Sequence, residues 1–400
     1  MDKSAEKPEF NLSSLQRPIL LGSLAFGILG FVLPIYGKQL GASAVEIGGL
    51  FSVFSVMTVL FRPIVGWALD HLGRKVFFVA AWIGYAVAMA LFALADNLFG
   101  LYLARLVQGI ASSFCWISAY TIATDVASTD RRGNAVGRVD EASAQGALYG
   151  AFIGFAVLGF LPLLTGWRVL FGAYALMALA GAWLAWKKVP ETRPAQPVRA
   201  PSRQSFSWPL FRLMIIVFVT GLSTAMIGPL LLIFLQDRFT TQVETLALAF
   251  IPSALVYSFL PSHMGRLSDR FGRVPLMAMG LAASGLVSLL LPGLTSLVWL
   301  IILWVVEAIG LTAAAPAQEA LVADLTGNEV RGTGYGLYTF AASVGATFGP
   351  LIGGWLYDAA GHATPFYLNG IVLLAGTLAV WVLLRGKSHR ALPQPIGQSQ

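Results

Sequence analysis

The chain has few charged residues and one cysteine. Only 11% of its 400 residues are Asp, Glu, Lys or Arg, against about 25% in soluble globular domains, whereas 57% are hydrophobic. The charge deficit extends along the whole sequence, in apolar runs of about 18 to 25 residues, the length with which a helix crosses a bilayer core. This composition excludes a soluble globular domain and predicts a membrane protein with many spans.

The lone cysteine, Cys115, lies inside an apolar run, which excludes an internal disulfide and a CxxC metal site. The sequence also lacks a Walker motif, an HExxH zinc motif and the nucleophile elbow of hydrolases. We therefore expect no enzymatic activity, no cofactor and no bound metal.

Breaks at charged, Gly and Pro clusters divide the sequence into twelve candidate spans. They predict an all-α integral membrane protein with twelve transmembrane helices in two pseudo-symmetric six-helix bundles. The predicted domains are residues 1–187, a polar cytoplasmic linker at 188–209, and residues 210–400. The expected spans are Ile19 to Leu40, Val45 to Leu69, Val76 to Ala95, Leu98 to Ala123, Ala135 to Leu161, Val169 to Trp186, Leu213 to Leu235, Leu246 to Met264, Val274 to Leu294, Leu297 to Leu321, Gly334 to Leu356 and Phe366 to Leu384.

The basic residues are distributed unevenly between the two sides of these spans. With the N-terminus inside, 21 of the 26 Lys and Arg residues face the cytoplasm, three face outward and two lie within spans. The positive-inside rule then predicts cytoplasmic termini and a multi-pass protein of the cell (plasma or inner) membrane. Since topology explains the net charge of +7, we expect the lipid bilayer as a partner and no nucleic acid.

A repeat relates the two halves at a constant offset of 199 residues. Pairs of identical Gly, Asp and Arg residues at one offset are not a product of chance in a Gly-rich chain, so they indicate an internal duplication. The matched residues in the loop after spans 2 and 8 are Gly66, Asp70, Gly73 and Arg74 with Gly265, Asp269, Gly272 and Arg273. Those in spans 5 and 11 are Gly146, Gly150 and Gly154 with Gly345, Gly349 and Gly353.

The motifs themselves resemble those of the major facilitator superfamily. "GWALDHLGRK" at 66–75 resembles its signature between spans 2 and 3, and "RLVQG" at 105–109 resembles its span 4 motif. The resemblance covers essentially the whole chain and implies a secondary transporter that works by alternating access. It also implies that the two loops act as a conformational latch through ion pairs of their charged residues. The latch residues are Gly66, Asp70, Gly73 and Arg74 in the first loop and Gly265, Asp269, Gly272 and Arg273 in the second.

The glycines of spans 5 and 11 recur every four residues and so form smooth stripes for helix packing. In the antiporter branch of the superfamily a proline follows the second glycine of the span 5 stripe. Here Ala151 stands at that position, and the proline occurs in span 11 as Pro350. Packing alone explains the stripe.

Ionisable and amide groups inside spans predict the substrate and proton pathway, because burying them in hydrocarbon is costly. Arg105 lies about 10 Å deep in span 4 with Gln108 one turn further in, and resemblance assigns this arginine to substrate or proton handling. Glu307 lies near the midplane of span 10, at the repeat position of Gln108. Because desolvation favours its neutral form, this carboxyl group is a candidate for proton binding or for contact with a cationic substrate.

Two adjacent carboxylates, Asp140 and Glu141, lie about 10 Å into span 5 from the cytoplasm. Neighbouring residues on a helix point about 100° apart, so we expect one to face the cavity and the other to pair with Arg138 or Arg62. Glu141 is the choice for the cavity because Gln145 shares its face.

We expect a proton-coupled exporter of small hydrophobic or cationic compounds, working as a monomer with small molecules and protons as partners. One alternative is a proton-coupled importer or uniporter of a sugar-like or carboxylate metabolite, with Arg105 binding an anion. Another is a non-transporting membrane sensor on the same fold.

Overall fold

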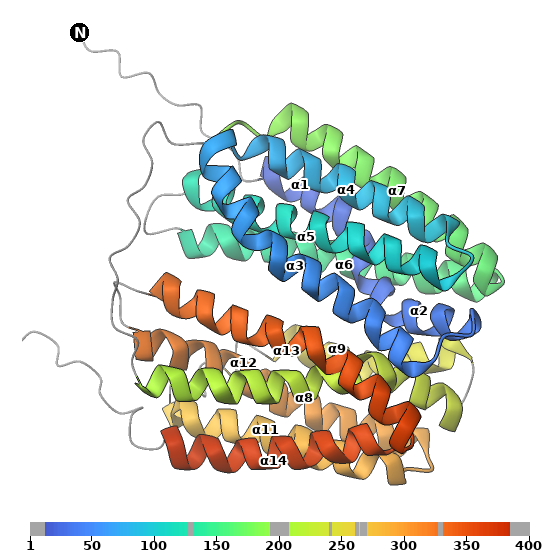
Figure 1. Cartoon of the computed structure of the whole chain (residues 1–400), viewed down its shortest axis with the longest axis vertical. Helices are drawn as coiled ribbons and strands as arrows, with labels where there is room; N and C mark the ends of the chain where they lie inside the picture. Colours follow the sequence, from blue (N-terminus) through green and yellow to red (C-terminus); the bar gives the residue numbers. More distant parts are fainter. Residues whose placement is uncertain are drawn as a thin grey trace, which may run out of the picture. The chain divides into compact units, whose positions relative to one another are not determined.

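The computed structural model describes residues 13–126, 132–192, 208–239, 242–260, 264, 270–326 and 331–384. Throughout these ranges the secondary structure is helical and no strand occurs. The predicted all-α class is confirmed (Figure 1).

The first six spans correspond to helices that we call the first bundle. The first span consists of three consecutive segments, namely α1, the 3-10 helix η1 and α2. The bounds are α1 Ser13–Gly22, η1 Ser23–Ala25, α2 Phe26–Gln39, α3 Ala44–Leu72, α4 Lys75–Leu94, α5 Leu98–Val126, α6 Arg132–Phe160 and α7 Leu163–Lys188.

The last six spans correspond to helices that we call the second bundle. Their bounds are α8 Trp208–Arg238, α9 Val243–Phe259, α11 Arg273–Leu290, η3 Leu291–Gly293, α12 Leu297–Thr326, α13 Arg331–Ala360 and α14 Thr364–Leu384. Among the described residues, ten helical segments are long and apolar enough to cross a membrane, and the other two predicted spans coincide with α9 and α13. The protein is therefore a multi-pass membrane protein.

Several helices extend beyond the apolar runs that predicted them. Helix α3 continues to Leu72, and α5 continues through Asp125 to Val126. An apolar run ends at the first polar side chains. The helix itself continues, because its backbone hydrogen bonds extend into the membrane interface, where polar side chains are solvated. At its N-terminus α3 is fixed by a capping box, in which the Ser43 hydroxyl accepts from Glu46 N and the Ser43 N–H donates to the Glu46 carboxylate.

The chain forms two compact units. One contains Met1–Ala200 with Gly228–Phe234 and Pro350–Asp358, and the other contains Pro201–Ile227, Leu235–Gly349 and Ala359–Gln400. The predicted domain boundaries stay a prediction, and residues 193–207 of the predicted linker lie outside the described residues.

In each bundle the helix of the third span packs against the helices of the fourth and sixth spans. In the first bundle α4 packs against both α5 and α7, and in the second α11 packs against both α12 and α14. An aromatic cluster fills the first bundle, where the Trp167 ring stacks on Tyr36 at 4.1 Å between ring centres. Large apolar side chains such as Phe160 and Val382 point outward, 89% and 78% exposed, as expected for surfaces that face lipid.

Candidate functional site

Arg105 on α5 is buried, with 5% of its surface exposed. Its Nε donates to the Leu50 carbonyl oxygen at 3.0 Å, and its Nη1 donates to Gln108 Oε1 at 2.8 Å. Its guanidinium carbon lies 4.8 Å from the centre of the Phe51 ring and 4.6 Å from that of Phe54. A carbonyl group, an amide and two ring faces therefore hold the positive charge.

A cavity of about 220 Å³ opens beside this arginine, within the first bundle. An apolar cavity of about 150 Å³ accommodates a benzene ring, so this one has room for a small aromatic ring system. Gly30 contributes to the space, since nothing lies within 4 Å of the position its Cβ would take. The lining residues are Phe26, Leu29, Gly30, Phe51, Phe54, Tyr85, Arg105, Gln108, Ser112 and Trp116.

A chain of rings leads from this cavity to Asp140. Phe26 and Trp116 lie 6.1 Å apart between ring centres, and Trp116 stacks on Tyr120 at 5.9 Å. The Tyr120 hydroxyl donates to Asp140 Oδ1 at 2.6 Å, a short hydrogen bond of the kind formed with a carboxylate. The geometry thus connects Asp140 with the aromatic cavity.

Glu141 and Gln145 pair with each other along α6, as their shared helix face predicts. Gln145 Nε2 donates to Glu141 Oε1 at 3.2 Å, and both side chains are exposed in the described structure. The sequence favoured Glu141 as the carboxylate of the cavity, whereas the ring chain joins the cavity to Asp140. The roles of both carboxylates remain proposals.

Glu307 on α12 is half-buried and lies beside Ser284 of α11 and Tyr257 of α9. One turn earlier, Trp304 is buried and stacks on Phe250 of α9 at 4.3 Å between ring centres. Among the described residues no lysine or arginine pairs with Glu307. The carboxyl group is therefore surrounded by apolar and hydroxyl groups.

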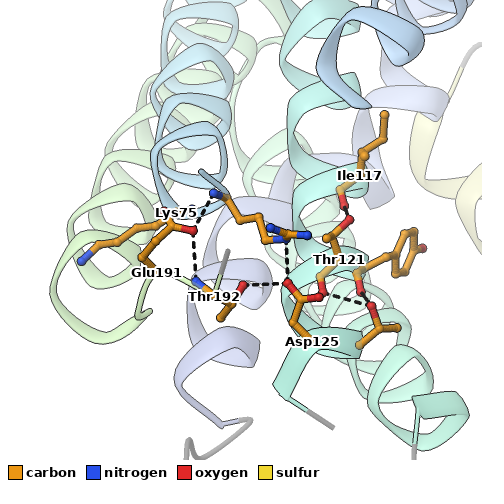
Figure 2. A network of polar contacts seen from close by, with 9 residues as sticks. Lys75, Ile117, Thr121, Asp125, Glu191 and Thr192 are labelled. Atoms are coloured by element: carbon orange, nitrogen blue, oxygen red, sulfur yellow. Dashed lines mark hydrogen bonds and ion pairs between the residues drawn. The ribbon is translucent and has the colours of Figure 1, made fainter. Parts of the chain in front are cut away.

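The loop after α3 forms a polar network at one end of the first bundle (Figure 2). Gly73 has a φ of +101°, which places it in the left-handed region that favours glycine. The next residue, Arg74, is buried and forms an ion pair with Asp125 at the end of α5, with 2.6 Å between Nε and Oδ2. This ion pair joins the start of α4 to the end of α5 inside one bundle.

Glu191, three residues after α7, completes the network. Its carboxylate accepts hydrogen bonds from the backbone N–H groups of Arg74 at 2.8 Å and Lys75 at 3.2 Å (Figure 2). The Thr192 hydroxyl donates to Asp125 Oδ2 at 3.0 Å. A negative charge at the N-terminus of α4 is stabilised by the helix dipole and the free N–H groups there.

The other predicted latch residues are less fully described. Gly66 lies in α3 with open space around its Cβ position, and the Asp70 side chain lies outside the described residues. In the second loop Gly265 and Asp269 also lie outside them, while Gly272 repeats the positive φ, at +93°, just before Arg273 opens α11. The repeated sequence thus gives the same backbone turn twice.

The glycine stripe of α6 lies against the first span. A Cβ on Gly146 or Gly150 would collide with the carbonyl groups of Leu20 or Leu24, and one on Gly154 would lie 2.7 Å from the Ile28 side chain. These contacts place the α6 backbone directly against α1 and α2.

The stripe of α13 makes a similar approach. A Cβ on Gly345 would lie 2.6 Å from Leu222 N, and one on Gly349 would lie 2.5 Å from Leu222 O on α8. Pro350 follows inside α13, and Gly353 is buried.

A membrane protein built from two related helical bundles, with a ligand-sized aromatic cavity and isolated ionisable groups inside its spans, belongs to the class of membrane transporters. The sequence matches the profile of the Major Facilitator Superfamily over residues 19–212 and again over 213–399. The chain belongs to this family, which confirms the resemblance of its motifs and makes it a transporter of small molecules and not an enzyme.

Relatives and solved structures agree with this membership. The chain is 24% identical over 390 residues to "Multidrug resistance protein 1" of Bacillus subtilis (strain 168), covering 96% of this chain and 98% of the relative. It is 26% identical over 401 residues to "Tetracycline resistance protein, class E" of Escherichia coli, covering 95% and 96%. A bacterial homolog of the human lysosomal transporter Spinster, in an inward-facing and occupied conformation, has the same fold, with a TM-score of 0.77, 18% identity and coverage of 95% and 98%.

Sequence reasoning missed three partners of the predicted residues. Asp125 could have been singled out, because the 199-residue repeat pairs it with Asp324. Its ion pair with Arg74 is visible only in the tertiary structure. No sequence pattern points to the contacts of Tyr120 with Asp140 or of Glu191 with the backbone of Arg74, since each joins different segments of the chain.

Proposed function

We propose that the chain is an exporter that exchanges protons for small hydrophobic or cationic compounds by alternating access. The observation that carries the proposal is Glu307, a half-buried carboxyl group inside a span with no basic partner among the described residues. A structural ion pair would keep such a group permanently charged, whereas an unpaired carboxyl group in a membrane can bind and release a proton.

The cavity of the first bundle supports aromatic or hydrophobic compounds as substrates. Five of its ten lining residues are Phe, Tyr or Trp, which offer flat apolar contact. The Asp140 carboxylate at the end of the ring chain is suited to attract a cation.

The relatives favour export over import. Those cited above bear the names of multidrug and tetracycline resistance proteins, and a further relative of 24% identity over 379 residues is "Quinolone resistance protein NorA" of Staphylococcus aureus (strain MSSA476). At such identities the names support the direction of transport without defining the compound.

The alternative of an imported carboxylate metabolite has less support. It needs Arg105 as an anion receptor, but the Nε and Nη1 donors already bond to Leu50 O and Gln108, and two rings lie over the guanidinium. A non-transporting sensor would have no need of a substrate-sized cavity or of Glu307. We further propose cytoplasmic termini, from the distribution of basic residues, and a monomer as the working unit.

Everted membrane vesicles with an imposed pH gradient test the proposal directly. Ethidium, a planar aromatic cation, serves as the probe, and its accumulation is followed by fluorescence. We expect accumulation that collapses when the gradient is dissipated, and that is lost in Glu307→Gln. Asp96→Asn, which removes an exposed carboxylate between α4 and α5, is the control and should behave as wild type.

Accumulation that ignores the gradient would contradict proton coupling. Normal gradient-driven accumulation in Glu307→Gln would remove Glu307 from the mechanism. Uptake of a carboxylate probe in the opposite direction would favour the importer.

A further inference from the structure

Helices α11 and α12 cross at small residues in the second bundle. A Cβ added to Gly280 would lie 2.5 Å from Gly310 O, and one added to Gly310 would lie 2.7 Å from the Ala283 Cβ. Such glycines let two backbones approach more closely than larger residues allow. The relative position of the two helices is therefore fixed at this crossing.

Ser284 and Glu307 meet one turn away from the crossing. Ser284 lies four residues after Gly280 on α11, and Glu307 lies three residues before Gly310 on α12, so consecutive, oppositely directed helices bring both to the same level. Ser284 accordingly lies beside the Glu307 carboxyl group.

The Ser284 hydroxyl lacks the usual acceptor of a serine in a membrane helix. Thr220 and Thr312 each donate to a carbonyl oxygen three or four residues back in their own helix, at 2.7 and 2.9 Å. Ser284 is 4% exposed, and within the described part of the chain its Oγ makes no hydrogen bond of normal geometry. A buried hydroxyl needs an acceptor, and the Glu307 carboxyl group is an acceptor that lies beside Ser284.

We propose that Ser284 is a positioning residue that donates its hydroxyl hydrogen bond to Glu307 when the carboxylate is ionised, and so sets the pH range in which Glu307 exchanges its proton. The proposal rests on the proposed function, in which Glu307 carries the proton. A hydroxyl suits both states of the cycle, because it donates to the carboxylate and accepts from the protonated acid. In each cycle Glu307 binds one proton and releases the same proton, and Ser284 only rotates.

A second hydroxyl on α11 provides a matched control. Ser288 lies one turn beyond Ser284 and is equally buried, but it accepts a hydrogen bond from Asn369 Nδ2 of α14 at 2.7 Å, and Asn369 Oδ1 accepts from Ser223 of α8 at 2.7 Å. Both partners of this hydrogen bond are neutral side chains. Ser288 therefore contributes to packing between helices and not to proton exchange.

The other groups around Glu307 are few. Helix α12 packs mainly against α11 and α9, and among the described residues α9 presents Tyr257 as the titratable neighbour. In the described structure no charged side chain from either helix faces the carboxyl group.

The test is the pH profile of ethidium exchange by the full-length protein in proteoliposomes. We expect Ser284→Ala to shift the pH of half-maximal exchange upward by about one pH unit, because the ionised carboxylate loses a charge-assisted hydrogen bond. Ser284→Thr retains the hydroxyl and should restore the wild-type profile. Ser288→Ala should leave the profile unchanged while lowering the thermal unfolding temperature in detergent.

An unshifted profile in Ser284→Ala, or equal shifts in Ser284→Ala and Ser288→Ala, would overturn the proposal. If Ser284→Ala does not insert in the membrane, Ser284→Cys keeps the volume with a weaker donor, and it should give a smaller upward shift. Failure of the proposed function is a separate result, seen as ethidium accumulation by the wild-type protein that ignores the pH gradient.

Discussion

The two bundles carry different chemistry at the same positions of one duplicated scaffold. The 199-residue offset pairs Phe51 with Phe250, Arg105 with Trp304, Gln108 with Glu307 and Tyr85 with Ser284. In the first bundle Arg105 lies over Phe51 and bonds to Gln108, and in the second Trp304 stacks on Phe250 while Glu307 lies beside Ser284. Phe51 in span 2 and Phe250 in span 8 are the same residue type. The charged residue is Arg105 in the first bundle, whereas in the second it is Glu307, which lies one helical turn beyond the position equivalent to Arg105.

A second contrast concerns the buried neutral polar residues. Ser223, Ser288 and Asn369 form a buried hydrogen-bonded set in the second bundle. The offset pairs them with three apolar residues of the first, namely Leu24, Met89 and Leu170. Duplication has thus preserved the helix packing, whereas the polar groups have diverged between the halves.

Removing the charge of the second bundle should have the largest effect. Glu307→Gln gives both bundles a glutamine at this position and removes the proposed proton carrier. We expect gradient-driven ethidium export to fall to the level of vesicles without the protein, while binding of the dye, measured by fluorescence anisotropy, persists. Loss of binding as well would indicate a role in contacting the substrate.

Replacing the charge of the first bundle should have the next largest effect. Arg105→Lys cannot bridge Leu50 O and Gln108 while lying flat between two rings, so we expect about a ten-fold slower export. Ser118→Ala on the same helix is the control, because Ser118 bonds to carbonyls of its own helix. Full activity of Arg105→Lys would show that only the positive charge of Arg105 is needed, and not its hydrogen bonds.

The ion pair between Arg74 and Asp125 should contribute mainly to stability. Arg74→Gln leaves Asp125 without its cation, and we expect the free energy of unfolding in detergent to fall by about 1 to 3 kcal/mol. A double-mutant cycle with Asp125→Asn measures the coupling between the two side chains. Additive effects would mean that Arg74 stabilises the fold through other contacts.

The neutral set of the second bundle should have the smallest effect. Asn369→Ala removes two hydrogen bonds, and we expect a loss of about 1 kcal/mol, since such bonds between membrane helices contribute modestly. Ser223→Ala removes one of the two hydrogen bonds and should lose less stability. Thermal unfolding of both variants in detergent measures the difference. A larger loss in Ser223→Ala would show that the set does not act through Asn369.

The helices and their approximate positions follow from the sequence, because apolar length is dictated by the bilayer. The same reasoning identifies Gly146, Gly150 and Gly154 as a packing stripe, since a spacing of four residues defines one face of a helix. The sequence does not predict which helix packs against that face. The structure shows that it is the first span.

Site residues are predictable as rare groups in apolar spans, but their partners are not. Arg105 was identified by its depth, whereas its position between Phe51 and Phe54 depends on how α3 packs against α5. Asp140 is joined to the ring chain through the Tyr120 hydroxyl of another helix, a contact that no local pattern encodes. Partners that are distant in the chain require the tertiary structure.

The position of Glu191 bears on how this protein can be divided into fragments. Because Glu191 binds the first N–H groups of α4 and Thr192 binds Asp125, the chain after α7 still belongs to the first bundle. A first-half fragment for co-expression with the second half should therefore end beyond Thr192. Truncation at Lys188, where α7 ends, would leave the N-terminus of α4 uncapped in a piece that otherwise contains every helix of its bundle.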